Sequence, residues 1–320
     1  MYGAIFFIYC TLLIPVTLSS FTLQRRPSEV TGPCKTPFDI PRLQAINLPE
    51  SFSWNNINGL SYLTPNRNQH IPVYCGSCWA FASVSALQDR VKIKRQGFGP
   101  DIVLSPQHVL NCIDDGSSCH GGEVDSVYRW LSGLSETGQG LSYEDAQPYQ
   151  ACSSESDAQL CRVIDLTCKP INIARTCGSF DQEGGECKGL KKYPFVSISD
   201  YGVIRGHKSM QQEIYHRGPI ACGVDAMPLL NYRGGIIDKK GDEIDHVVEV
   251  VGWGTDHWIV RNSWGSYWGE NGFVRIAFGA LKLEEECTWA TVKDYTAPER
   301  HNQVPCTEGG DCGDPLFPVL

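Results

Sequence analysis

The sequence predicts an α+β fold in which a helical first half lies against a β-rich second half. One pattern follows Cys78, where apolar residues recur at spacings of four, three and four, as on one face of a helix. These residues are Ala80, Val84, Leu87 and Val91. The other pattern starts near Tyr201, where short β-branched and aromatic runs between glycine-rich turns indicate an antiparallel sheet or barrel. A cleft between two such lobes is a common place for a functional site.

Two helices can be placed in the first half from local signals. The first begins near Cys78 and meets a stop signal at Gly97. The second is expected near Ser105 to Asn111, because a serine that can cap a helix is followed by proline at the first helical position.

Strands and loops account for the rest of the expected domain. Strand patterns cover residues 246–254, 257–265 and 272–278. Residues 150–190 hold five cysteines among Gly, Ser, Asp and Glu, with little apolar periodicity. We therefore expect this segment to consist of loops joined by disulfides.

Composition and charge argue against several classes of protein. A chain of 320 residues can build a sizeable core. Its net charge of -9 and its lack of a basic block argue against nucleic acid as a partner. The apolar start, residues 1–20, is too short to span a bilayer comfortably and ends in small residues, so we interpret it as a cleaved secretory signal. No later stretch is long and apolar enough for stable membrane insertion.

Changes in composition divide the remainder of the chain. Residues 21–47 are polar and contain several prolines, as expected of a short propeptide. Aromatic content rises at residue 48, and we expect the main folded domain over residues 48–290. Residues 291–320 are rich in Pro, Gly and charge, and we interpret them as a C-terminal extension without assigned chemistry.

Cysteine usage points to an oxidising compartment. The chain has 15 cysteines, and removal of Cys10 with the signal leaves fourteen, an even number that suits a disulfide framework. Cys75 and Cys78 form a CxxC pair, which is typical of a redox site, a zinc knuckle or a nucleophile beside a structural cysteine. Zinc is disfavoured because no second CxxC exists, and a thioredoxin-like site would need a smaller domain. The local motif alone leaves the choice open.

A set of residues far apart in the sequence suits thiol catalysis. Cys78 lies at or near a helix N-terminus, where backbone amides favour a thiolate. His246 heads one predicted strand and Asn262 follows the next, so antiparallel pairing could bring them together. The Asn262 amide oxygen would then fix the tautomer of the His246 base. Gln69 could add a side-chain N–H beside the Cys78 amide to hold an oxyanion.

Four motifs that occur in order resemble the papain family of cysteine proteases: CGSCWAFAS, CHGG, DHVVEVVGWG and WIVRNSWGSYWGENGF. The resemblance covers about residues 48 to 290. It implies a papain-like fold with a helical left lobe, a β-barrel-like right lobe and an active-site cleft between them. It also implies peptide hydrolysis without a metal or an organic cofactor.

Site residues carry over by their position in these motifs. The resemblance implies that Cys78 is the nucleophile, His246 the acid and base, Asn262 the residue that orients it, and Gln69 the oxyanion residue. Other matching residues would shield the site, bind an extended substrate through the backbone, or be structural. They are Trp264 as the shield, Gly121 and Gly122 as the backbone contact, and Cys75 in a disulfide with Cys119.

The stretch between Gln69 and Cys75 narrows the resemblance. Papain-like enzymes usually have two residues there, whereas this chain has the five residues HIPVY. This resembles the cathepsin X (cathepsin Z) subgroup, in which the inserted loop leaves room for one residue beyond the scissile bond. The resemblance implies a carboxypeptidase that removes single residues, with His70 binding the C-terminal carboxylate and Tyr74 as a further substrate contact. A charged imidazole pairs with a carboxylate, so the activity should favour acid conditions.

The subgroup also implies regulation by the propeptide. Setting aside Cys34 and Cys78 leaves 14 - 2 = 12 cysteines, enough for six pairs. Cys34 is the only propeptide cysteine and, by the resemblance, would bond the Cys78 sulfur and keep a zymogen inactive.

The resulting expectation is a lysosomal or extracellular enzyme of the secretory pathway. It would act as a monomer on peptides or proteins with a free C-terminus, with its own propeptide as inhibitor. Two alternatives remain open at this point. One is a papain-like endopeptidase, and the other is a non-catalytic, disulfide-rich binding protein.

Overall fold

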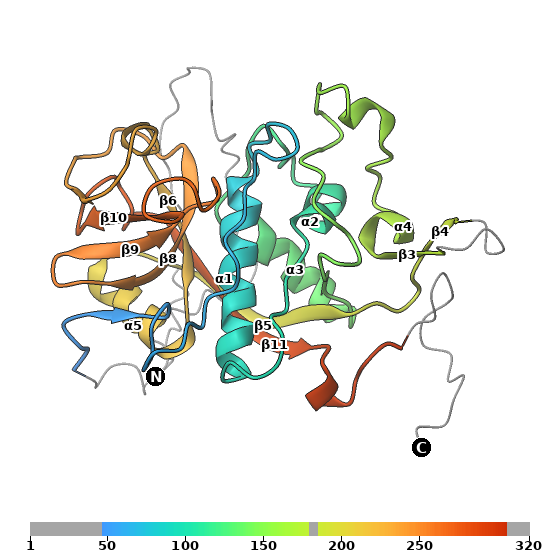
Figure 1. The fold of residues 1–320 in the computed structure, drawn as a ribbon, viewed down its shortest axis with the longest axis horizontal. Helices are drawn as coiled ribbons and strands as arrows, with labels where there is room; N and C mark the ends of the chain where they lie inside the picture. Colours follow the sequence, from blue (N-terminus) through green and yellow to red (C-terminus); the bar gives the residue numbers. More distant parts are fainter. Residues whose placement is uncertain (1–46, 179–184, 306–320) are drawn as a thin grey trace, which may run out of the picture.

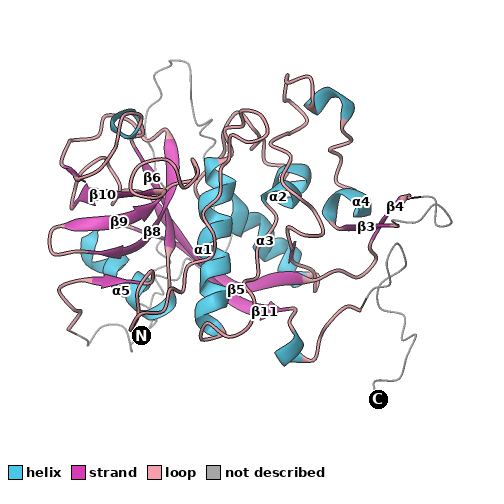
Figure 2. Ribbon diagram, in the orientation of Figure 1, coloured by secondary structure: helices cyan, strands magenta, loops and turns pink. Residues whose placement is uncertain are grey.

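A computed structural model describes residues 47–178 and 185–305 of the chain (Figure 1). Helix α1 (Cys78–Lys94) runs through the middle of the molecule. Most of the sheet lies on one side of α1, and the smaller helices of the first half lie on the other, as Figure 2 shows. These helices are α2 (Pro106–Cys112), α3 (Ser126–Glu136) and α4 (Pro170–Ile173).

Helix α1 forms where the apolar spacing predicts it and is buried almost all round. The four residues of the predicted face are fully buried, and so are polar neighbours such as Gln88 and Asp89. A helix buried on every side belongs in a core, and α1 packs against β6 (Ile220–Val224), β8 (His246–Trp253) and β11 (Cys287–Tyr295). The helix ends before Gln96 and Gly97, both of which have positive φ.

Helix α2 confirms the predicted cap. The Ser105 hydroxyl accepts the N–H of His108 at 3.0 Å, and Pro106 is the first helical residue. Helix α3 was not predicted. Helix α5 (His207–Arg217), which lies in the β-rich second half, was not predicted either. Its sequence is mostly polar, and only Met210, Glu213 and Ile214 are buried, so no clear apolar face announces it.

The cysteine-rich segment is held by disulfides, as predicted. Two bridges close short loops, Cys152–Cys161 and Cys177–Cys187, and a third ties the segment to α2 through Cys112–Cys168. Regular structure there is limited to α4, the 3-10 helix η3 (Cys161–Val163) and the hairpin of β3 (Arg175–Cys177) and β4 (Cys187–Gly189). The predicted Cys75–Cys119 bridge is also present, and Cys222–Cys287 joins β6 to β11.

The main sheet has nine strands in the order β2-β5-β11-β6-β8-β9-β10-β7, with β1 paired to β8. The strands not yet given bounds are β1 (Phe52–Ser53), β2 (Leu141–Ser142), β5 (Phe195–Ile204), β7 (Ile236–Ile237), β9 (His257–Arg261) and β10 (Phe273–Ala277). All pairs are antiparallel except β10 with β7. No ladder joins β2 to β7 within the described residues, so the sheet is open and is not a closed barrel. Strand β11 ends at Tyr295, past residue 290, where the main domain was expected to end. Two 3-10 helices, η5 (Met227–Leu229) and η6 (Pro298–Arg300), lie outside the strands.

Each lobe has its own hydrophobic core. One cluster surrounds α1, α2 and α3, and the other fills the space around β6, β8, β9 and β10. The register of β8 and β9, in which Glu249 faces Arg261, puts His246 and Asn262 at the same end of this strand pair. Among the residues that the structure describes, no helix combines the length and apolar character needed to cross a bilayer.

A buried ion network fixes the strand that leads to Asn262. The Arg261 guanidinium contacts Asp89 of α1 and Glu249 of β8 at 2.6 Å each, and donates to the Thr64 carbonyl at 2.6 Å. All three charged side chains are almost fully buried. Removal of one partner would leave a buried charge uncompensated, which costs about 3–5 kcal/mol. The network therefore links α1 of one lobe to β8 and β9 of the other, next to Asn262.

Candidate active site

Cys78 is the first residue of α1 and is the free cysteine among the described residues. Its sulfur receives backbone hydrogen bonds from Val247, Trp79 and its own amide. No described side chain caps this end of α1, because the Ser77 hydroxyl bonds the Tyr149 hydroxyl at 2.7 Å instead. The unpaired amides of the first turn are thus left for the sulfur and for a bound anion.

Burial and the backbone act in opposite directions on this thiol. Burial raises the pKa of Cys78 to about 11, while the hydrogen bonds from Val247 and Trp79 lower that pKa in part. The effect of the helix N-terminus expected from the sequence is present, but burial outweighs it. A thiolate therefore needs a proton acceptor and a positive charge beside it.

His246 and Asn262 meet as the strand pairing predicts. His246 Nε2 lies 2.8 Å from Asn262 Oδ1, and the same oxygen accepts the Ser263 N–H at 2.8 Å. Because Oδ1 can only accept, Nε2 donates, and Nδ1 is the nitrogen left to take a proton. His246 directly precedes Val247, whose backbone contacts the Cys78 sulfur. The start of β8 thus brings a base to the thiol.

Burial keeps His246 neutral when it is considered alone. Its side chain is nearly inaccessible, and burial lowers its pKa to about 4, partly opposed by the bond to Asn262. The positive charge of His70, whose ring contacts Trp264 as the His246 ring does, lowers the His246 pKa further. Thiol and imidazole can therefore charge together as an ion pair, in which their attraction offsets the cost of burial.

Gln69 is fixed from both lobes. Its Nε2 donates to the Cys75 carbonyl at 3.1 Å, and its Oε1 accepts the Ser263 hydroxyl at 2.7 Å. Its backbone N–H also donates to the Ser263 carbonyl at 2.9 Å. One hydrogen of the amide remains for an oxyanion beside the Cys78 N–H. Ser263 was not predicted, and no sequence signal separates it from other serines.

The two glycines of the CHGG motif differ in what they can offer. Gly121 has φ +125° and exchanges backbone hydrogen bonds with Ser118, at 2.8 and 3.2 Å. Gly122 would place a Cβ 2.6 Å from the Trp79 ring, so a side chain there is excluded. Within the described residues no hydrogen bond engages the Gly122 backbone. Gly122 is therefore the glycine whose peptide groups are available to an extended substrate.

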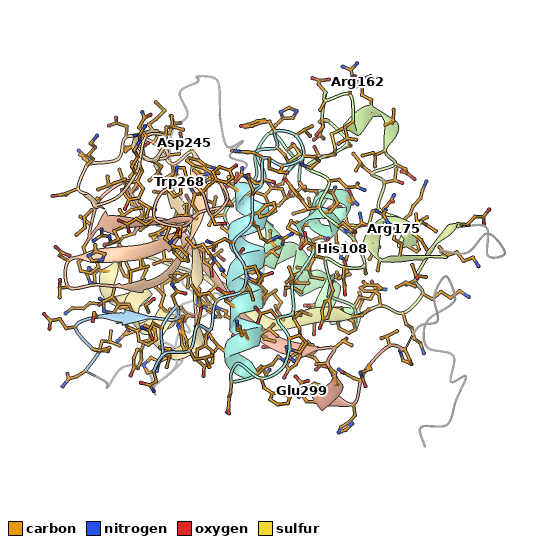
Figure 3. All side chains as sticks on the ribbon, viewed as in Figure 1. His108, Arg162, Arg175, Asp245, Trp268 and Glu299 are labelled. Carbon is orange, nitrogen blue, oxygen red and sulfur yellow. A yellow bond between two sulfur atoms is a disulfide. The ribbon has the colours of Figure 1, made fainter. Side chains whose placement is uncertain are left out.

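Trp264 stands beside the His–Asn pair. Its ring centroid lies 5.0 Å from that of His246 and 5.2 Å from that of Trp268. The pair itself is buried, with His246 4% and Asn262 3% exposed. Shielding from water strengthens the bond between them. Figure 3 labels Trp268 and Asp245 near the upper end of α1, on the side of the sheet.

The inserted loop places His70 against the same tryptophan. The His70 ring stacks on Tyr74 at 4.9 Å and on Trp264 at 6.2 Å between centroids. Burial lowers the pKa of half-buried His70. Burial and the nearby Cys78 charge raise the pKa of Tyr74, a residue that is 67% exposed. Both candidate substrate contacts of the insert thus lie near the catalytic residues.

A cavity of about 640 Å³ continues from His70 and Trp264. Its other lining residues are Asn68, Leu230, Tyr232, Arg233, Tyr267, Trp268 and Gly269. Apart from His70 and Trp264, the sequence patterns named none of these as substrate contacts, because they come from separate turns that only the fold brings together.

One regulatory prediction falls outside the described residues, and one histidine that is close to Asn262 in the sequence lies away from the site. Cys34, the predicted regulatory partner of Cys78, lies outside the described residues. His257 lies only five residues before Asn262 in the sequence, but it begins β9 at the opposite end of the strand pair. Its Nδ1 lies 2.7 Å from Asp256 Oδ1, so its ring is engaged there and not at the site.

Comparisons with known proteins agree with this arrangement. Residues 48–296 match the papain family of cysteine proteases. Cathepsin Z of Onchocerca volvulus is 41% identical over 76% of this chain and 78% of its own length. Mouse cathepsin K is 30% identical over 68% of this chain and 56% of its own length.

Solved structures show the same fold. A cysteine protease of Carica candamarcensis, solved in complex with E-64, has a TM-score of 0.57 and 28% identity, covering 77% of this chain and all of its own. Procathepsin L2 of Tenebrio molitor has a TM-score of 0.60 at 24% identity over 80% of this chain and 72% of its own, which bears on the fold alone. The predicted papain-like, two-lobe fold is confirmed.

Proposed function

Because the chain belongs to the papain family of cysteine proteases, we propose that it is a carboxypeptidase of the cathepsin X type that removes single C-terminal residues. The prediction of a papain-like cysteine peptidase is confirmed by the family match and by the relatives. The finer assignment is supported by the 41% identity to a cathepsin Z and by one structural observation. That observation is His70, held by stacking on Tyr74 and Trp264 next to the catalytic histidine.

The geometry supports a short distance between the reacting bond and the carboxylate. The ring centroids of His70 and His246 lie 6.2 and 5.0 Å from that of Trp264, so both histidines flank one indole. A C-terminal carboxylate on His70 would leave room for about one residue before the bond that His246 serves. The charge-assisted hydrogen bond then selects the free carboxylate.

The chemistry proceeds by acyl transfer. The Cys78 thiolate attacks the carbonyl carbon of the last peptide bond, and the Gln69 amide and the Cys78 N–H hold the oxyanion. The His246 imidazolium gives its proton to the leaving nitrogen, which departs as a free amino acid. Water, deprotonated by His246, then attacks the thioester and releases the shortened peptide and the thiol. Asn262 keeps the imidazole oriented through both steps.

The proposal extends to maturation and location. The chain would enter the secretory pathway, act in the lysosome or outside the cell as a monomer, and start as a zymogen in which Cys34 bonds Cys78. Five disulfides among the described residues fit an oxidising compartment. Peptide mapping of the intact, inactive precursor tests this, because an unmodified Cys34 thiol there would refute the zymogen bond.

The central test combines a variant with a change in the substrate. Wild type and His70→Gln are assayed on one peptide as the free acid and as the C-terminal amide. A hydrogen bond to a charged group contributes about 1.5–3 kcal/mol, so wild type should prefer the acid on the order of 10- to 100-fold in kcat/KM. His70→Gln should reduce this preference to near unity.

Two controls make the result specific. His301→Gln changes an exposed histidine on the opposite lobe and should keep the wild-type preference. Labelling of Cys78 by a thiol-reactive epoxide should proceed at the wild-type rate in His70→Gln, because the catalytic pair is intact. An unchanged preference for the acid in His70→Gln would reject the carboxylate role of His70.

A further inference from the structure

We propose that Arg233 makes this site selective for C-terminal residues with acidic side chains, aspartate and glutamate. This inference rests on the proposed carboxypeptidase function and adds the class of residue that is removed. Its basis is the charge and shape of the cavity beyond His70 and Trp264.

The cavity adjoins the place that the carboxypeptidase proposal gives to the departing residue. Its wall includes His70, which would hold the α-carboxylate, and Trp264, which contacts the base His246. A residue that spans the distance between His246 and His70 can extend its side chain into this cavity, because His70 and Trp264 belong to its wall. The volume of about 640 Å³ falls within the range of sites that enclose small ligands.

The charges on the cavity wall have one sign. Among the described residues that line it, Arg233 and His70 are the only basic side chains, and none is Asp or Glu. Arg233 is exposed and forms no ion pair within the described residues. The neighbouring carboxylate, Glu270, is held by Arg275 at 2.7 Å and by the Gly235 N–H at 3.1 Å, so it is not left to neutralise Arg233.

The backbone that carries Arg233 is well fixed. The preceding Tyr232 is 8% exposed, donates its hydroxyl to the Gly235 carbonyl at 2.6 Å and lies 5.7 Å from the Trp268 ring. Gly234 and Gly235 have φ of +154° and +90°, a region that favours glycine and shapes the turn. The guanidinium is therefore presented from a defined turn at the edge of the cavity.

An acidic side chain matches this wall better than other side chains do. With the α-carboxylate on His70, the guanidinium remains free for a second carboxylate, which it can bind through two parallel hydrogen bonds. The rings of Tyr232, Trp264 and Trp268 exclude water from part of the cavity and strengthen the pair. A lysine or arginine at the same place would be repelled.

The test compares peptides that differ only in the last residue, Glu, Gln or Lys, at about pH 5.5, where a glutamate side chain is ionised. Wild type should remove Glu about tenfold faster than Gln in kcat/KM, and Lys more slowly than Gln. Arg233→Gln should bring the rate for Glu down to that for Gln and leave the Gln peptide unchanged. Arg233→Glu should prefer Lys. Arg205→Gln, an exposed arginine between β5 and α5, is the matched control and should behave as wild type.

The other outcomes are separable. A wild type without preference for Glu, or a preference that survives Arg233→Gln, overturns the proposal. Equal slowing of the Glu and Gln peptides by Arg233→Gln also overturns it, because Arg233 would then bind the α-carboxylate. Internal cleavage of all peptides contradicts the carboxypeptidase function instead. In that case the residue after the cleaved bond is scored, and an Arg233-dependent preference for Glu there still supports the cavity's selectivity, whereas its absence refutes it.

Discussion

Two histidines of this protein contact the same indole and differ in almost everything else. The ring of His246 lies 5.0 Å from Trp264, is buried and bonds Asn262 at 2.8 Å, and burial lowers its pKa to about 4. The ring of His70 lies 6.2 Å from Trp264, is half-buried and stacks on Tyr74. Among the described residues, no hydrogen bond engages the His70 ring nitrogens.

The comparison shows that the surroundings of a histidine side chain decide which role it can take. Asn262 occupies Nε2 of His246 and leaves one nitrogen to exchange a proton with Cys78, which suits an acid and base. His70 keeps both nitrogens for a ligand, so it can only bind and orient. Loss of the first should therefore remove all chemistry, whereas loss of the second should change only which peptides are cut.

The largest effect is expected from His246→Ala. Without the base, trimming of a free-acid peptide and epoxide labelling of Cys78 should both fall by about 10⁴-fold, the upper end of what a positioned acid–base group supplies. Steady-state kinetics and the labelling rate measure this, and thermal unfolding shows whether the fold is retained. Labelling within tenfold of wild type would mean that His246 does not activate Cys78.

A smaller effect on peptide trimming is expected from a change in pH, and we attribute it to the titration of His70. Burial lowers the pKa of His70 below its usual value of about 6.5, so the imidazolium is complete below that shifted pKa and is lost as pH rises through it. The ratio of peptide trimming to Cys78 labelling should therefore fall about tenfold per pH unit above the shifted pKa. His70→Gln should show a flat ratio, and a falling ratio in that variant would assign the titration to another group.

Secondary-structure elements were predicted best where a short stretch of sequence determines the structure by itself. The apolar spacing after Cys78 and the Ser105–Pro106 cap located α1 and α2. The short β-branched and aromatic runs placed His246 and Asn262 on neighbouring strands, and the structure shows them at one end of that strand pair. Helix α5 was not predicted, because its mostly polar sequence shows no clear helical period of apolar residues.

Features built from distant turns could not be predicted in this way. Ser263 holds Gln69 through a hydroxyl that no motif distinguishes, and Arg233 joins the cavity only because the turn after Tyr232 folds toward Trp268. Burial is likewise a property of the folded chain. It outweighs the stabilisation of a thiolate expected at the helix N-terminus, since burial raises the pKa of the Cys78 thiol to about 11.

The most direct measurement is product mass spectrometry of the wild-type enzyme, activated under reducing conditions at acid pH, on one peptide with a free C-terminus and on its amidated twin. The account predicts successive loss of single residues from the free acid and an intact amide. Internal cleavage of both peptides alike, or removal of dipeptides, would contradict the claim that His70 limits the site to one residue beyond the scissile bond.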